Sequence, residues 1–154
     1  MIRFDPVASR RELWGHVLWF FAWLGVTIVG LILTPSKNGH GTHQQLGLPP
    51  CPSVILFERP CPGCGLTTSW TATLHGQLVA AFAAHNLGPI LYALFTASAF
   101  ACLYGVATKK RFDTDGPAFN RFLVMLTVAF FAYGIARMAL VRAPLRYETP
   151  FFRR

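Results

Sequence analysis

The spacing of the charged residues limits what this chain can fold into more than any other feature of the sequence. Three long stretches contain no Asp, Glu, Lys or Arg: residues 13–36, 60–108 and 122–136. A helix needs about 20 apolar residues to cross the hydrocarbon core of a bilayer. Charged residues make up 13% of the chain, against about 25% in average soluble domains. The sequence therefore predicts an integral membrane protein rather than a soluble one.

The apolar stretches predict an all-α fold in a single membrane domain over residues 1–154, with three transmembrane helices. We expect these spans at about 13–33, 89–106 and 122–141. The third span reaches full length because Arg137, near its end, is expected to snorkel toward the headgroups. Since the spans contain no Asp or Glu, a proton pump or an ion-coupled transporter is disfavoured.

Two segments separate the first span from the second. Residues 34–65 are rich in Gly and Pro, which break regular elements, and predict a Cys-rich loop. Residues 66–85 follow a CPGCG turn and carry apolar side chains every four positions, with threonines on the other face. This pattern predicts an amphipathic or partly inserted helix, so three and four crossings both stay possible. His75 and His85 could line a polar cleft beside it.

The net charge of +8 favours a lipid partner over nucleic acid, because the basic residues flank the apolar stretches. No RNA-binding motif accompanies them. The numbers of Lys and Arg on the two sides are nearly equal, so the side of the membrane that holds the Cys-rich loop stays undecided. The flanking basic residues are Arg3, Arg10, Arg11, Lys109, Lys110, Arg111, Arg142, Arg146, Arg153 and Arg154.

Cys61 and Cys64, in the sequence Cys-Pro-Gly-Cys-Gly, form the sharpest motif of the chain. A tight turn of this kind brings two thiolates to one ion, as in zinc knuckles. A closed tetrahedral site needs four ligands, and the motif supplies two. Cys51, His40 and His43 lie just upstream. The sequence therefore offers these five residues as ligands for zinc or another transition metal.

Two other interpretations of the motif stay open. In a thiol–disulfide protein, Cys61 would attack a substrate disulfide and Cys64 would resolve the intermediate, because a helix N-terminus favours the thiolate. Cys51 could relay electrons to them. Alternatively, the turn is only structural, and the cysteines fill space or form a disulfide with Cys51. Cys102 lies within the second predicted span and is expected to serve packing.

No nucleotide-binding, nucleophile-elbow or zinc-protease motif is present in the sequence. The sequence therefore favours a non-enzymatic membrane protein with no catalytic residue. We expect an accessory subunit of a larger membrane complex, with the Cys-rich loop held by a metal or a disulfide. Its partners would be the bilayer and either another membrane protein or a second copy of the chain. The alternative function is thiol–disulfide exchange or metal handling by Cys61 and Cys64.

The segment 51–95 resembles a bacterial family named for its domain of unknown function 2752. The resemblance is carried by Pro-Cys-Pro-Gly-Cys-Gly-Leu-Thr at 60–67, by His75 and Gly76, and by Asn86 before an apolar helix. Thr68 and Gln77 stand where the family pattern usually has Arg and Asp. The resemblance implies a small, multi-pass protein of the bacterial inner membrane and no particular reaction.

Overall fold

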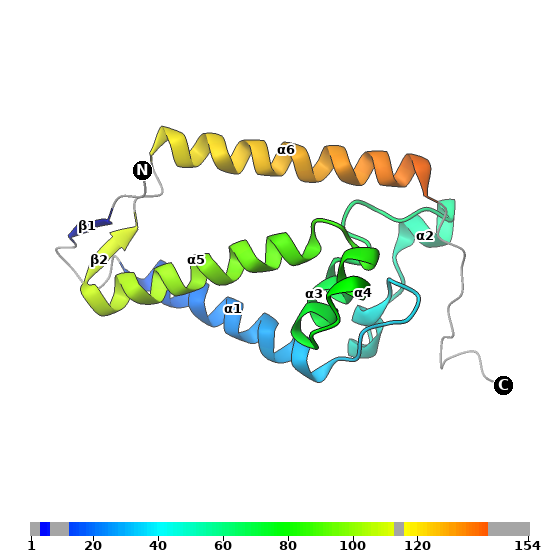
Figure 1. The fold of residues 1–154 in the computed structure, drawn as a ribbon, viewed down its shortest axis with the longest axis horizontal. Coiled ribbons are helices and arrows are strands. Elements are labelled where there is room, and N and C mark those ends of the chain that lie inside the picture. Colours follow the sequence, from blue (N-terminus) through cyan, green and yellow to red (C-terminus); the bar gives the residue numbers. More distant parts are fainter. Residues whose placement is uncertain (1–3, 7–12, 113–115, 142–154) are drawn as a thin grey trace.

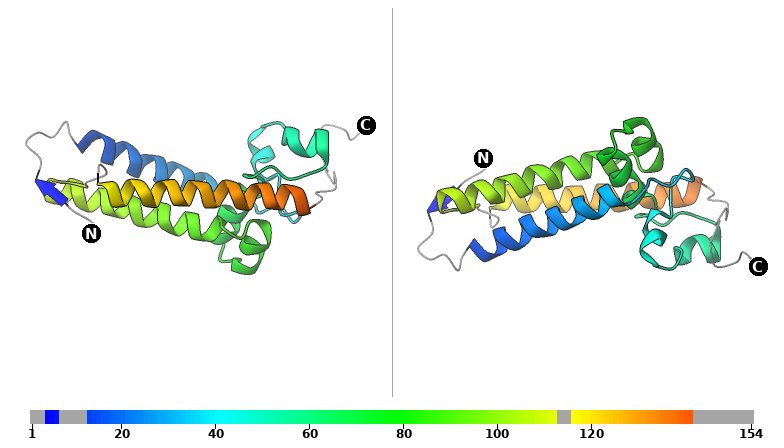
Figure 2. Two further views of the ribbon diagram at one scale, coloured as in Figure 1. Left: turned by 90° about the horizontal axis from the view of Figure 1, so that it is seen from above. Right: turned by 90° about the horizontal axis from the view of Figure 1, so that it is seen from below.

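The computed structural model describes residues 4–6, 13–112 and 116–141. Of the three long helices, the first two lie side by side and the last runs in roughly the same direction farther from them (Figure 1), and short helices gather at one end (Figure 2). In chain order the elements are β1 (Phe4–Pro6), α1 (Trp14–Ile32), η2 (Thr42–Leu46), α2 (Pro52–Phe57), α3 (Leu66–Leu74), α4 (Leu78–Ala84), α5 (Gly88–Thr108), β2 (Lys110–Phe112) and α6 (Pro117–Leu140).

The all-α membrane fold is confirmed. Helices α1, α5 and α6 have 19, 21 and 24 residues and are each long and apolar enough to cross a membrane. The chain is thus a multi-pass membrane protein by the length and composition of its helices. Pro89 and Pro117 lie in the first turns of α5 and α6, where a missing backbone N–H costs nothing. Because Pro117 opens it, α6 begins five residues before the predicted position 122.

The two strands add a small ribbon that the sequence did not predict. β1 and β2 pair antiparallel, with Phe4 opposite Phe112 and Pro6 opposite Lys110. This pairing ties the start of the described chain to the end of α5. The predicted basic positions Arg3, Arg10 and Arg11 and the tail 142–154 lie outside the described residues.

Helices α1 and α5 are joined along their length by side-chain hydrogen bonds. The donors and acceptors on α1 recur every four residues and therefore lie on one face. Polar pairs of this kind stabilise contacts between helices in lipid, where no water competes for them. The pairs are Trp19 Nε1 to Ser98 Oγ at 2.9 Å, Trp23 Nε1 to Thr96 Oγ1 at 3.0 Å, and Thr27 Oγ1 with Tyr92 Oη at 2.7 Å.

The segment 66–85, predicted as one helix, forms two. The chain reverses between α3 and α4 at Gly76, whose φ of +73° is readily adopted only by glycine. With nine and seven residues, neither helix can cross a bilayer. Trp70 anchors α3 to α5, because its Nε1 donates to the carbonyl oxygen of Gly88 at 2.9 Å and its ring packs against Tyr92.

The Cys-rich loop 34–65 is ordered by polar contacts as well as by η2 and α2. Thr42 is fully buried, and its Oγ1 lies 2.8 Å from Oγ1 of Thr68 on α3. The same oxygen accepts a hydrogen bond from the backbone N–H of Ser36. The loop is therefore folded against the α3–α4 hairpin at the end of the molecule where α1 ends and α5 begins (Figure 1).

Candidate metal centre

The Cys-Pro-Gly-Cys segment forms a tight turn that leads into α3. The backbone N–H of Cys64 donates to the carbonyl of Cys61 at 2.9 Å, and that of Leu66 donates to Gly63 at 3.1 Å. Such bonds close the chain so that residues three apart lie on one side of the turn. Both cysteines of the motif thereby point into the same region.

Gly65 connects this turn to α3 and can only be glycine for two reasons. Its φ is +86°, in the left-handed region. In addition, a Cβ atom at this position would clash with the carbonyl oxygen of Ala84 and lie 2.8 Å from that of Gly39. The turn is thus packed against the end of α4 and against the loop at once.

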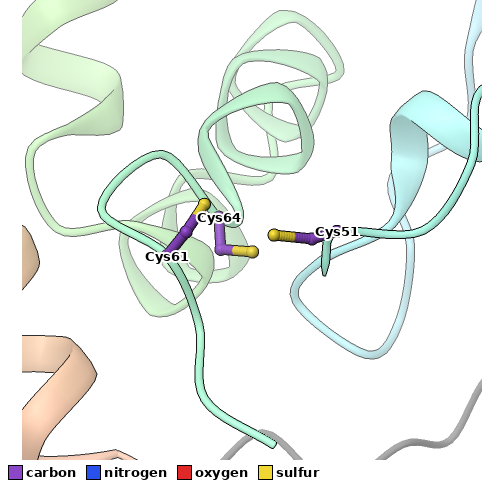
Figure 3. A group of neighbouring side chains, drawn as sticks. All are labelled: Cys51, Cys61 and Cys64. Atoms are coloured by element: carbon purple, nitrogen blue, oxygen red, sulfur yellow. The ribbon is translucent and has the colours of Figure 1, made fainter. Parts of the chain in front are cut away.

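Cys51 reaches the same region from a different element. It caps α2, because its carbonyl oxygen accepts bonds from the N–H groups of Val54 and Ile55. The Sγ atoms of Cys51, Cys61 and Cys64 all lie within 4.8 Å of one another, and those of Cys51 and Cys64 face each other (Figure 3). We call these three residues the cysteine cluster. All three are free thiols in the structure.

The cysteine cluster has a closed side and a more accessible side. Cys64 is buried and packs against Val54, which has no exposed surface. Cys51 and Cys61 are only partly buried. An ion among the three sulfur atoms would therefore rest on an apolar base and face outward past Cys51 and Cys61.

The thiols of the cluster differ in acidity because they share hydrogen bonds. Burial raises the pKa of Cys64 above its ordinary value, and the hydrogen bond with Cys51 raises it further. Burial also acts to raise the pKa of Cys51. Hydrogen bonds from Cys64, Cys61 and the backbone of Ser53 and Val54 outweigh it, so this pKa lies below its ordinary value. Cys51 is thus the more readily ionised thiol, with Cys64 as its donor.

The structure does not bring His40 and His43 into the cysteine cluster. His40 Nδ1 lies 2.8 Å from the carbonyl oxygen of Asn38, and His43 Nε2 lies 3.2 Å from that of Pro49. Within the described residues, the group with metal-ligand spacing consists of the three cysteines. Of the five candidate ligands, the fold therefore gathers three.

His85 contacts the backbone of the cysteine turn. Its side chain is fully buried, and its Nε2 lies 3.1 Å from the carbonyl oxygen of Pro62. The ring packs against Phe130 and Tyr133 of α6. Burial lowers the pKa of His85, which keeps the ring neutral.

His75 lies apart from His85 and the cysteine turn, since its Nε2 is 3.0 Å from the carbonyl oxygen of Leu33. The two histidines thus serve separate contacts.

The side chain of Arg137 turns inward to the cysteine turn, where the sequence predicted that it would snorkel toward the headgroups. Its Nη1 donates to the carbonyl oxygen of Cys64 at 2.6 Å, and its Nη2 donates to that of Ala84 at 2.8 Å. The carbonyl of Ala84 ends a helix and needs a donor. Since the side chain of Arg137 satisfies both groups from α6, turning inward is favoured over reaching for the lipid surface.

Arg59, which precedes the cysteine turn, binds the backbone of α6 in return. Its Nη1 donates to the carbonyl oxygens of Met138, at 2.8 Å, and of Ala139 at the end of α6. A cation at this end of a helix also meets the negative end of the helix dipole. We call Arg59 and Arg137 the arginine pair. Each of them fixes the backbone of the other's segment, so α6 and the cysteine turn are held together twice.

Replacement of Arg137 by glutamine is expected to lower the free energy of unfolding by about 2 kcal/mol, the usual worth of a hydrogen bond to a charged group in a partly buried setting. Arg121→Gln is the matched control, because Arg121 is exposed on the same helix. Thermal unfolding in mild detergent measures both. Equal melting temperatures for the two variants would show that the bonds to Cys64 and Ala84 contribute nothing.

Sequence reasoning missed Arg59, Arg137 and Gly134 as parts of this site. Only Arg137 carried a signal, since an ionisable residue within a predicted span often marks function. Gly134 lies against Pro62, so that α6 approaches the turn closely. No local pattern indicated that residues some 70 positions apart would meet.

Residues 51–99 match the model of a family described as Protein of unknown function (DUF2752). The matched segment runs from Cys51 through the turn, α3 and α4 into α5, and so contains the whole cysteine cluster. No curated protein and no solved structure matches the chain.

Proposed function

We propose, from the premise that residues 51–99 carry the DUF2752 segment, that this chain is a non-enzymatic membrane protein with a transition-metal centre. Cys51, Cys61 and Cys64 would bind one ion, with zinc as the first expectation. The observation that carries the proposal is the convergence of three sulfur atoms within 4.8 Å. Thiolate ligands suit zinc and other soft ions.

The convergence of three thiols favours a metal over a structural disulfide. A disulfide would use two of the cysteines and leave the third buried or half-buried beside it without a covalent role. A metal ion uses all three, and it also offsets the raised pKa of Cys64, because a coordinated thiol loses its proton. The ion would fix the short helix α2 to the turn before α3, and so hold the Cys-rich loop in one shape.

The role that fits such a centre is that of an accessory subunit. The structure has the folded Cys-rich loop at one end and large exposed apolar side chains on all three long helices. These side chains suit lipid and lateral packing against another membrane protein or a second copy. The resemblance to the bacterial family supports a place in the inner membrane of a bacterium.

Protein purified in mild detergent is expected to contain about one metal ion per chain and to carry a fixed membrane partner. Cys64→Ser and Cys51→Ser should lower the metal content at least about tenfold, since they remove one of three ligands. Cys102→Ser is the matched control, because Cys102 lies in α5 outside the cluster. Elemental analysis and partner identification on one sample measure both properties.

Two outcomes of this purification would contradict the proposal. If Cys64→Ser kept its full metal content, the proposed metal centre would be contradicted. If the protein purified as a monodisperse, solitary chain, the accessory-subunit role would be contradicted. Metal-free protein linked to a partner through a thiol would favour the second candidate function, thiol–disulfide exchange, instead.

The lowered pKa of Cys51 is the observation in favour of that second candidate. A Cys51 thiolate, in place of the Cys61 thiolate expected from the sequence, would attack a substrate disulfide and release one substrate thiolate, forming a mixed disulfide. Cys61 or Cys64 would then displace the remaining substrate thiolate. The chain would end with one disulfide between two of its cysteines, and the substrate would have gained two electrons.

A further inference from the structure

The cysteine cluster supplies fewer ligands than a closed metal site needs. Four ligands complete a structural zinc site, and the cluster offers three. The chain has five histidines and four cysteines, and all nine lie in the described ranges. A fourth ligand from this set would have to be one of the other six.

The other six residues all lie elsewhere. His40, His43, His75 and His85 each have a ring nitrogen within 3.2 Å of a backbone carbonyl oxygen. His16 is near Gly105, toward the β2 end of α5. Cys102 lies within α5. None of the six belongs to the group of ligand atoms within 4.8 Å of one another.

The cysteine cluster is closed on one side and accessible on the other. Cys64 and Val54 close one side, with 7% and 0% of their surfaces exposed. Cys51 and Cys61 are only partly buried, so a fourth ligand would enter past them. Zinc sites with three protein ligands characteristically keep such a position for an exchangeable group.

The chemistry of the cluster favours a soft ligand in the fourth position. An ion that already has three thiolates prefers another soft donor to a hard one. The guanidinium of Arg137 donates to the carbonyl oxygen of Cys64, so a cation lies beside the turn. A thiolate is both soft and negatively charged.

We propose that the metal centre keeps its fourth position for one external thiolate. This inference rests on the proposed function of the cysteine cluster. An incoming thiol would give its proton to solvent, form a metal–sulfur bond and displace a coordinated water. No electron is transferred. The thiol would come from a small molecule or from a cysteine of a partner protein, and the bond formed is the same in both cases.

Cobalt(II) in place of zinc makes this bond visible, because each cobalt–thiolate bond adds ultraviolet charge-transfer absorption. The full chain in mild detergent, loaded with cobalt(II), is titrated with mercaptoethanol in one arm and with a short cysteine-containing peptide in the other. The absorption should rise saturably by about one third, from three thiolates to four. Ethylene glycol, which has a hydroxyl in place of the thiol, should change nothing.

A cobalt-loaded protein whose spectrum ignores both thiols would overturn the proposal. Glu58→Gln locates the cause, since the Glu58 carboxylate directly follows α2 and could fill the fourth position from within the chain. A response that appears only in this variant would likewise overturn the proposal. A response to mercaptoethanol alone identifies the ligand source as a small thiol, and a response to the peptide admits a partner's cysteine. Protein that takes up no cobalt would contradict the proposed function instead.

Discussion

Replacement of Gly65 by alanine is expected to lower the free energy of unfolding by about 3 kcal/mol or more and to abolish metal retention. Two costs add up at this position. The φ of +86° disfavours any side chain, and the new Cβ would clash with the carbonyl oxygen of Ala84. Since that oxygen belongs to the backbone, it cannot rotate away. Either α4 or the cysteine turn must move.

Substitutions at two other glycines allow the conformational cost and the steric cost to be measured separately. Gly76 has a φ of +73°, but a Cβ atom there would meet no atom within 4 Å, so Gly76→Ala should show the conformational cost alone, about 1 kcal/mol. Gly63 has neither feature, and Gly63→Ala should be nearly neutral. Unfolding in detergent and metal content are measured for all three variants. If Gly65→Ala behaved like Gly76→Ala, the close approach of the turn to α4 would be unimportant.

Replacement of Gly134 by alanine is expected to lower the free energy of unfolding by about 2 kcal/mol, the usual cost of inserting a methyl group into a filled contact. The added Cβ would meet Pro62 Cβ and lie 2.6 Å from Pro62 Cα. Proline has no rotamer that yields, so α6 would have to withdraw from the turn. The bonds of Arg137 to Cys64 and Ala84 would lengthen as a result.

The predicted loss of stability in Gly134→Ala is opposite in sign to the usual effect of this substitution within a helix. Within a helix, alanine is normally more stable than glycine by about 1 kcal/mol. Gly25, in the middle of α1, has no atom within 4 Å of its Cβ position. Gly25→Ala should therefore raise the melting temperature in mild detergent, while Gly134→Ala lowers it. Stabilisation by both substitutions would mean that α6 does not press against the turn.

The long helices could be predicted from the sequence because their signal is local. An uncharged stretch of about 20 residues has one stable form in lipid, whatever the rest of the chain does. The segment 66–85 was harder, because its apolar residues recur every four positions through the reversal at Gly76. The apolar residues of α3 and α4 have the same four-residue spacing, so the sequence pattern runs on through the turn at which α3 ends and α4 begins.

The candidate site was predictable in part for a related reason. Cys61 and Cys64 are close together in the sequence, and a tight turn necessarily brings them together. Cys51 is separated from Cys61 by residues 52–60, which include helix α2 and must fold back, and the structure places its Sγ within 4.8 Å of both others. His40 and His43 have a spacing suited to metal binding, but in an irregular loop their rings contact nearby carbonyl oxygens instead.

The contacts of α6 have a consequence for the order in which the molecule is assembled. All three cysteines precede α5 in the chain, and α1 and α5 can pair through their own hydrogen bonds. The carbonyl oxygens of Cys64 and Ala84 receive their donors only when Arg137 arrives on the last long helix. During synthesis, the backbone that carries Cys64 therefore lacks these donors until α6 has been made.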